Sequence, residues 1–185
     1  NRRSRGLGDV YKRQNAGGPI NGVDAINAIE TVIEDCVFTN LEVAVNADEG
    51  TLELRSSYFS GNERAVNVGS DVSEAVIEGC QFEDNLGGVS NAAPGVVRDS
   101  TFRRNGSLSP VRLPLHLAAP DGCQRVEDCH FEENAIVGAI RISRPGGESH
   151  VVSCTFEGNH TAGRGVLDVR QGGGVAIVSC RFVGN

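Results

Sequence analysis

One pattern of apolar and polar positions recurs seven times along the chain. Each copy has an aliphatic residue, then Cys or Ser three positions later, then Phe two positions after that. All seven phenylalanines of the chain fill this slot: Phe38, Phe59, Phe82, Phe102, Phe131, Phe156 and Phe182. Because the copies lie 20 to 29 residues apart, they predict a solenoid, in which each coil buries its apolar side against its neighbours.

A single coil is expected to contain three short strands. Val126 belongs to the first strand, and Cys129 and Phe131 share one face of the second because they are two residues apart. A bend must lie between these strands, at the turn-forming residue Asp128. The third strand alternates again around Ile140. This arrangement predicts an all-β, right-handed parallel β-helix of about six to seven coils.

A leucine-rich repeat is the alternative fold, because its consensus has the same spacing of apolar residues and Asn. Its next apolar residue, two positions after the Asn, is missing from most copies. Those positions hold Arg64, Gly87, Ser107, Ile136 and Thr161. The intervening segments also alternate with period two rather than with a helical period. The pattern therefore favours the β-helix.

Five of the six cysteines share one slot of the repeat. They are Cys36, Cys80, Cys129, Cys154 and Cys180, and Ser57 and Ser100 take the same slot in the other copies. Stacked coils would place these small side chains in an internal column, where Cys acts as a small buried apolar residue. No C-x-x-C pair is present, so we expect no metal and no cofactor.

An Asn follows the Phe by three positions in six copies: Asn62, Asn85, Asn105, Asn134, Asn159 and Asn185. We expect this column to point inward and to cap the second bend by bonding the backbone of adjacent coils. Asn105 and Asn159 also begin glycosylation sequons. An inward amide cannot carry a glycan, so the structural role is favoured.

Composition and charge limit the partners of the chain. The net charge is −7, although residues 1–14 carry a local +4 and fit no repeat. Residues 1–14 resemble a translated sequencing adapter and are expected to be non-native, leaving 15–185 as one β-helix domain, incomplete at its C-terminus. The remaining acidic chain is a poor partner for nucleic acid. It contains no apolar run of about 18 residues, so we expect no membrane span in this fragment.

The repeated Cys-x-Phe-x-x-Asn phrase, followed in one coil by Gly138-Ala139-Ile140, resembles the repeats of chlamydial polymorphic outer-membrane proteins. More broadly, it is similar to the parallel β-helix repeats of the pectate-lyase-like superfamily, over residues 33–185. The resemblance implies an extracellular or cell-surface location. That superfamily includes polysaccharide lyases and hydrolases, autotransporter passengers and adhesins, so the fold alone does not select a function.

In enzymes of that superfamily the substrate lies along one strand face. The corresponding outward column of the third strand is expected to hold Asn46, Asn67, Ser90, Arg112, Arg141 and Asp168. A glycosidase needs two facing carboxylates, whereas this column offers only Asp168. We expect Arg141 and Asp168 to form a solvated surface ion pair. The candidate ligand-binding residues are Asn67, Ser90, Arg112, Arg141 and Asp168, and no catalytic residue is predicted.

Other polar residues have simpler expected roles. Outward residues of the first strand alternate in sign, which predicts charge pairing between coils; they are Glu34, Arg55, Glu78, Arg98 and Glu127. Each of the four histidines, His116, His130, His150 and His160, is expected on the surface or in a loop.

The favoured function is a non-catalytic secreted or cell-surface segment, acting as an adhesion or stalk scaffold in a larger protein. Two alternatives remain: a fragment of a polysaccharide lyase or glycoside hydrolase, and a module that binds a polysaccharide or cell-surface glycan without turnover. Because a β-helix has open strand edges at its ends, the isolated chain is expected to associate end to end.

Overall fold

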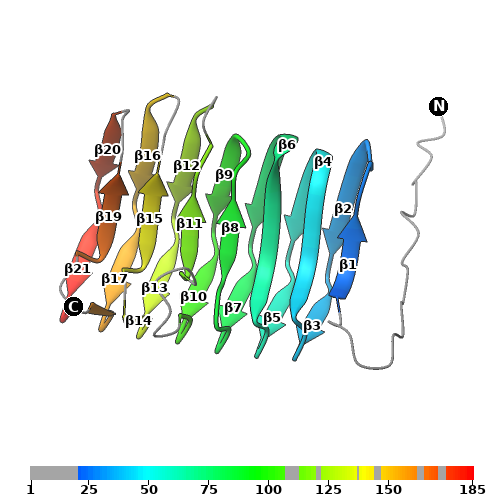
Figure 1. Cartoon of the computed structure of the whole chain (residues 1–185). Helices are drawn as coiled ribbons and strands as arrows, with labels where there is room; N and C mark the ends of the chain where they lie inside the picture. The colour runs from blue at the N-terminus through cyan, green and yellow to red at the C-terminus, as the bar shows by residue number, and fades with distance from the viewer. Residues whose placement is uncertain are drawn as a thin grey trace.

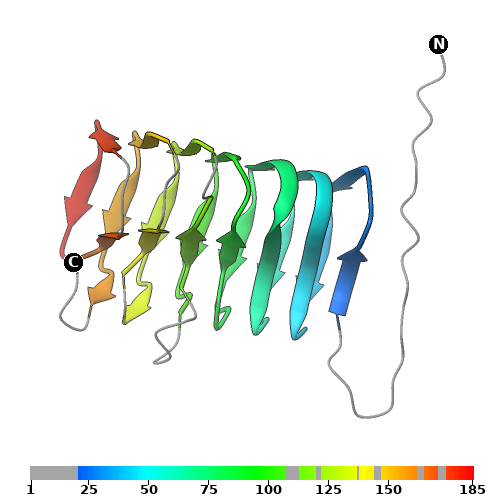
Figure 2. The same ribbon diagram turned by 45° about the horizontal axis from the view of Figure 1, so that its top comes forward.

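A computed structural model describes residues 21–106, 113–119, 122–136, 138–143, 147–161, 165–170 and 174–185. Over these residues the chain forms strands and no helix, and it winds in about six turns into a parallel solenoid (Figure 1). Strands of successive turns lie side by side along its length, as Figure 2 shows from a second direction. The predicted parallel β-helix is confirmed, and the helical segments that a leucine-rich repeat can contain are absent from the described residues. The segment 1–14 lies outside these ranges.

Each coil contributes a strand to three faces. The first face contains the strands that precede the Phe strand: β2 (Glu30–Glu34), β9 (Gly95–Arg98), β12 (Gln124–Glu127), β16 (Ser149–Val152) and β20 (Val175–Val178). The second face contains the Phe strands: β3 (Val37–Thr39), β5 (Tyr58–Ser60), β7 (Gln81–Glu83), β10 (Thr101–Arg103), β13 (His130–Glu132), β17 (Thr155–Glu157) and β21 (Arg181–Val183).

The third face follows the second bend of each coil. It contains β1 (Asn21–Ala25), β8 (Val89–Asn91), β11 (Leu115–Leu117), β15 (Ile140–Ser143) and β19 (Leu167–Arg170). Two long strands, β4 (Val43–Arg55) and β6 (Arg64–Glu78), run from the third face into the first, which joins the two faces into one sheet. A further small sheet pairs β14 (Ala135–Ile136) with β18 (His160–Thr161).

Both bends that flank the second face use a left-handed backbone residue. At the first bend these residues are Asp35, Ser56, Gly79, Asp99, Asp128, Ser153 and Ser179, with φ from 47° to 62°. At the second they are Asn40, Gly61, Asp84, Arg104, Glu133, Gly158 and Gly184, with φ from 51° to 67°. Gly, Asn and Asp tolerate this conformation, which explains most of the residues found there. The predicted bends are confirmed.

The phenylalanines form a continuous stack inside the solenoid. Successive ring centroids lie 4.7 to 5.0 Å apart, with interplanar angles from 6° to 15°. The five central rings are at most 1% exposed: Phe59, Phe82, Phe102, Phe131 and Phe156. Each ring is therefore buried by the rings of the coils before and after it, as the repeat predicts.

The Cys and Ser slot closes the first bend. The Ser57 hydroxyl donates to the carbonyl of Arg55 at 2.8 Å and accepts the main-chain N–H of Cys36 at 3.1 Å. The Cys80 thiol donates in the same way to the carbonyl of Glu78, at 3.4 Å. All six cysteines are free thiols, and Cys123, outside the column, is exposed. The predicted column of stacked small side chains is confirmed.

The Asn slot closes the second bend in a repeating network. The Asn85 Nδ2 donates to the carbonyl of Phe59 at 3.0 Å and to Asn105 Oδ1 at 2.9 Å. The Asn85 main-chain N–H also donates to Asn105 Oδ1, at 3.1 Å. Asn105 and Asn159 are fully buried and make the equivalent bonds, so their sequon amides are occupied inside the fold. The predicted structural role of this column is confirmed.

Candidate functional site

One row of outward side chains crosses the third face from coil to coil. The strand register aligns Asp24, Asn46, Asn67, Ser90, His116, Arg141 and Asp168. Both sequence neighbours of most of these residues are buried, so the row itself faces away from the core. We call these seven residues the third-face row. It is the candidate binding surface, because it brings together Asn67, Ser90, Arg141 and Asp168 as predicted.

The position expected for Arg112 is occupied by His116. Ser90 pairs in register with His116, and His116 pairs with Arg141, whereas Arg112 lies outside the described residues. The apolar residues of this coil alternate from Val111 to Leu117, so a shift by four residues keeps the same side chains inward. Period-two alternation therefore could not fix the register here. His116, expected on the surface or in a loop, is the outward residue of β11 and is partly buried there.

The first half of the row is linked by amide and carboxylate hydrogen bonds. Asn46 Nδ2 donates to Asp24 Oδ1 at 2.9 Å and to Asp48 Oδ2 at 3.2 Å. Asn67 Nδ2 donates to Asn46 Oδ1 at 2.8 Å, and Arg64 donates to Asn67 Oδ1 at 3.3 Å. Two carboxylates thus lie close together, but the Asn46 amide occupies the space between them. A sugar ring would have to displace that amide to be flanked by both acids.

The repeat pattern of the sequence did not identify Asp24 as a member of the third-face row. It precedes the first Phe phrase, so no repeat slot marked it as part of the row.

The second half of the row contains a carboxylate held by two guanidinium groups. Arg141 Nε donates to Asp168 Oδ2 at 3.0 Å, and Arg170 Nε donates to both Asp168 oxygens at 3.0 and 2.9 Å. The predicted pairing across adjacent coils is confirmed. The expected solvation is not, because the side chains of Arg141 and Asp168 are only 11% and 14% exposed. Such a shielded pair is costly to break, since either partner alone would be a poorly hydrated charge.

His116 lies between the two halves of the row. Its Nε2 is 2.8 Å from the Ser143 hydroxyl oxygen. Burial, and then the nearby Arg141 charge, hold the His116 pKa below its usual value. The imidazole is therefore neutral at neutral pH and can exchange hydrogen bonds with hydroxyl groups. Beside it is a shallow hollow, lined by Arg64, Gly87, Gly88, Val89, Ser90, Leu113 and His116.

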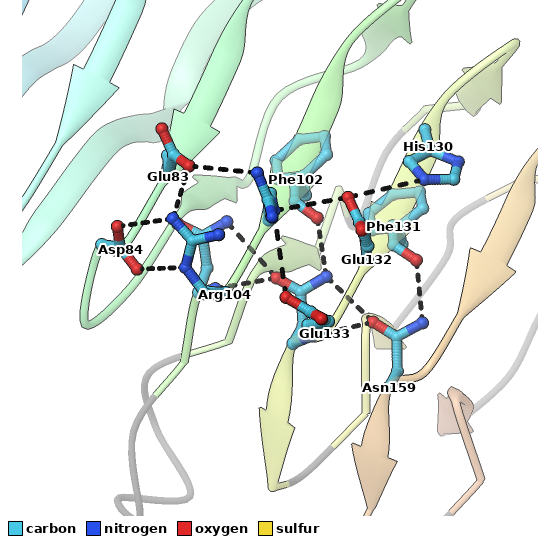
Figure 3. A network of polar contacts seen from close by, with 12 residues as sticks. Glu83, Asp84, Phe102, Arg104, His130, Phe131, Glu132, Glu133 and Asn159 are labelled. Atoms are coloured by element: carbon cyan, nitrogen blue, oxygen red, sulfur yellow. Dashed lines mark hydrogen bonds and ion pairs between the residues drawn. The ribbon is translucent and has the colours of Figure 1, made fainter. Parts of the chain in front are cut away.

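A second polar cluster surrounds the bend after the second face. Arg104 makes two bonds to Asp84, at 2.8 and 2.9 Å, and also bonds Glu83 (Figure 3). Tyr58 donates to Glu83 at 2.8 Å, and this bond, followed by Arg104, lowers the pKa of Glu83. Hydrogen bonding to Arg104 likewise lowers the pKa of Asp84. These carboxylates are held ionised by their neighbours.

Arg103 connects this cluster to the next coil. Its guanidinium lies 3.7 Å from Glu83 and 3.4 Å from Glu132, on the strands on either side. His130 Nε2 lies 3.9 Å from the same Glu132 carboxylate. The basic pair of one coil is therefore placed between the acidic pairs of its two neighbours. This is the geometry of ion pairing between coils, and its groups are directed at one another.

Charge pairing on the first face follows the predicted alternation. Arg98 lies 3.0 Å from Glu78, and Arg55 lies 3.8 Å from the same carboxylate.

Among the described residues, no group of three or more His, Cys, Asp and Glu side chains is placed to hold a metal ion. None of the described segments forms a helix long and apolar enough to cross a membrane.

Comparison with known families gives one match. The family model described as right handed beta helix region matches residues 17–185. No curated protein and no solved structure matches the chain. The match agrees with the parallel strand order and adds the right-handed sense of the coil.

Proposed function

Because the chain belongs to the right-handed β-helix family, we propose that residues 15–185 form a non-catalytic scaffold, a rigid stalk or adhesion segment of a secreted or cell-surface protein. The observation that carries this proposal is the continuity of the internal columns. The Phe stack and the Asn network run from coil to coil without interruption from Phe38 to Asn185. Such columns make a long, stiff body out of short strands.

The chemistry of the third-face row also favours a scaffold over an enzyme. Asp168 is neutralised by two arginines, and Asn46 links Asp24 to Asp48. Groups that bond one another in this way are held in position, but they offer no carboxylate pair around an open sugar site. The similarity to pectate-lyase-like and chlamydial outer-membrane repeats supports the cell-surface location as a proposal and leaves the polysaccharide lyase or hydrolase as its competitor.

A turnover assay separates the scaffold from the enzyme. Purified chain is incubated with polygalacturonate and with other acidic glycans, with and without Ca²⁺, and product formation is followed. We expect no turnover. Turnover that disappears in Arg141→Ala or Asp168→Ala would show that the row is catalytic, with Gln81→Ala, an exposed position on the second face, as the control outside the row.

A second candidate function is binding of a glycan along the third-face row. It is favoured by the regular outward placement of Asn67, Ser90 and His116 in successive coils beside a shallow hollow. Amide, hydroxyl and neutral imidazole groups exchange hydrogen bonds with sugar hydroxyls. A row with one polar side chain per coil suits an extended polysaccharide better than a compact ligand.

Calorimetric titration with soluble polysaccharides tests this second function. Asn67→Ala should weaken binding, because it removes an amide from the centre of the row. Gln81→Ala is the matched control, since Gln81 is an exposed amide on the second face. Equal affinities of the two variants would place the ligand elsewhere.

A further inference from the structure

A serine and a histidine on adjacent strands of the third face are in hydrogen-bond contact. His116 Nε2 lies 2.8 Å from the Ser143 hydroxyl oxygen. His116 is the outward residue of β11, and Ser143 is the last residue of β15, the neighbouring strand in the next coil. Ser143 fills no slot of the repeat and is not one of the seven residues of the third-face row, so neither pattern accounts for this contact.

The strand register explains how the two side chains meet. His116 pairs directly with Arg141, and Ser143 follows Arg141 by two residues, so both residues of β15 point outward. The imidazole is directed toward Ser143, its diagonal neighbour. Diagonal neighbours in a sheet remain within reach of an aromatic side chain. The contact therefore joins two successive coils on the outside of the solenoid.

The His116 imidazole is in a state that can accept a proton. Burial, and then the Arg141 charge, lower the His116 pKa, so the ring is neutral at neutral pH. In the tautomer that carries its proton on Nδ1, Nε2 accepts the hydrogen bond of the Ser143 hydroxyl. A serine hydroxyl at this distance from a neutral imidazole has the geometry of a nucleophile with its general base.

The charges around Ser143 favour negative charge on its oxygen. Ser143 pairs in register with Arg170 and lies two residues from Arg141 on the same strand. Both guanidinium groups bond the single carboxylate of Asp168, so two positive charges and one negative charge lie beside the hydroxyl. A net positive charge in a shielded site stabilises a serine alkoxide, and it also stabilises the oxyanion that forms when serine attacks a carbonyl.

The pair remains accessible to a small molecule. Ser143 and His116 are partly rather than fully buried. His116 also lines the shallow hollow of the third face, together with Ser90 and Gly88. A shallow surface suits a small acyl group, such as acetyl, better than a long acyl chain.

We propose that Ser143 is a nucleophilic serine, activated by His116, that accepts a small acyl group from a carboxylic ester. The Ser143 oxygen attacks the carbonyl carbon and forms a new ester bond, and the bond from that carbon to the alcohol oxygen breaks. His116 Nε2 takes the hydroxyl proton and passes it to the departing alcohol oxygen. Acylation modifies the chain itself, so the proposal goes beyond the scaffold role and is compatible with it.

Reaction of the full 185-residue chain with p-nitrophenyl acetate tests the proposal. Acetylation of each serine is followed over time by acid quenching and mass spectrometry of peptides. Ser60 is the internal reference, because it is an outward, partly buried serine on the second face. We expect Ser143 to be acetylated at least about a hundredfold faster, since a positioned general base contributes about 10²–10⁴-fold. A Ser143 that gains no acetyl group, or gains it no faster than Ser60, would overturn the proposal.

Two matched variants separate activation from a purely structural hydrogen bond. His116→Gln keeps a side chain that can bond the Ser143 hydroxyl but cannot take its proton, so acetylation of Ser143 should fall to the rate of Ser60. His130→Gln makes the same change at an outward histidine of the second face and should leave the rate unchanged. A rate that survives His116→Gln, or that is lost in His130→Gln, would contradict the role of His116. Circular dichroism of both variants confirms that each is folded.

Discussion

At the scale of single residues, the fold depends on side chains that each satisfy the coil before and the coil after. Phe131 is fully buried and stacks on Phe102 at 4.8 Å and on Phe156 at 5.0 Å. Asn134 accepts two bonds from Asn105 and donates to the carbonyl of Phe102. One substitution in such a column therefore disturbs two interfaces between coils.

Truncation of a central ring should be strongly destabilising. Phe131→Ala is expected to lower the free energy of unfolding by about 3–5 kcal/mol, as for other buried aromatic truncations. The exposed Glu133→Ala, in the adjoining bend, should change it by less than about 0.5 kcal/mol. Denaturant unfolding of both variants checks the difference. Equal losses would mean that the ring stack contributes no more than the surface.

Removal of a buried amide should also be costly. Asn134→Ala leaves the Asn105 N–H groups and the Phe102 carbonyl without their partner, so we expect a loss of about 2–5 kcal/mol. Asn67→Ala, in the partly exposed third-face row, should cost about 1 kcal/mol or less because water can replace its bonds. Thermal and denaturant melts measure both. A cheap Asn134→Ala would show that the network is dispensable.

Glu133 has a left-handed backbone, so its replacement by Gly is expected to stabilise the fold. Its φ is 52°, a region in which a Cβ is strained, and three other coils place Gly at this slot. Glu133→Gly should therefore raise stability by about 0.5–1 kcal/mol, whereas the branched Glu133→Val should lower it. Glu132→Gly, one residue earlier in β13, is the control and should be destabilising. Loss of stability in Glu133→Gly would show that the Arg103 contact outweighs the strain.

At the scale of elements, strands of three to five residues are held by their neighbours more than by their own sequence. β10 has three residues, and it is fixed between β7 and β13 by in-register pairing on both sides. Charges at the following bend reinforce this order, because Arg103 and Arg104 lie between Glu83 and Asp84 on one side and Glu132 and Glu133 on the other. These ion pairs therefore favour pairing between adjacent coils in the observed order.

This charge arrangement predicts a dependence of stability on pH. The pKa values of Glu83 and Asp84 are lowered in the folded state, so their stabilisation is present above the pKa values of the unfolded chain. This stabilisation is lost as the pH falls through the lowered pKa values of Glu83 and Asp84 in the folded chain. Stability should therefore decrease as pH is lowered from about 5, near the upper end of carboxyl titration in unfolded chains.

Arg104→Gln tests which groups are responsible. The variant should flatten part of the acid decline, because Asp84 would lose the main partner that lowers its pKa, while Glu83 would keep the hydrogen bond from Tyr58 and lose only the contribution of Arg104. Arg125→Gln is the control, since exposed Arg125 pairs with Glu127 on its own strand. An unchanged acid profile in Arg104→Gln would assign the decline to other carboxylates.

At the scale of the whole molecule, the repeated slots determined what could be predicted from sequence. Columns marked in every copy, such as that of Phe131, were placed correctly because a shift in one coil would break the match with all the others. The third strand has no such marker, so the position assigned to Arg112 belongs to His116. The shielding of Arg141 and Asp168 depends on their surroundings in the folded chain, which residue spacing does not show.

The proposed scaffold role requires the coils to behave as one rigid body. The internal columns connect each coil only to its neighbours, so a weak interface would divide the solenoid into parts that open separately. Four strands of the second face lie one after another along the same sheet: β5, β10, β13 and β17. Their protection therefore reports continuity along the molecule.

Hydrogen–deuterium exchange across these four strands tests that requirement most directly. We expect the main-chain amides of all four to exchange slowly and with similar protection, because the Phe and Asn columns pass through every coil between them. Rapid exchange in β10 or β13 while β5 and β17 stay protected would reveal a hinge in the middle of the solenoid and would contradict the rigid scaffold.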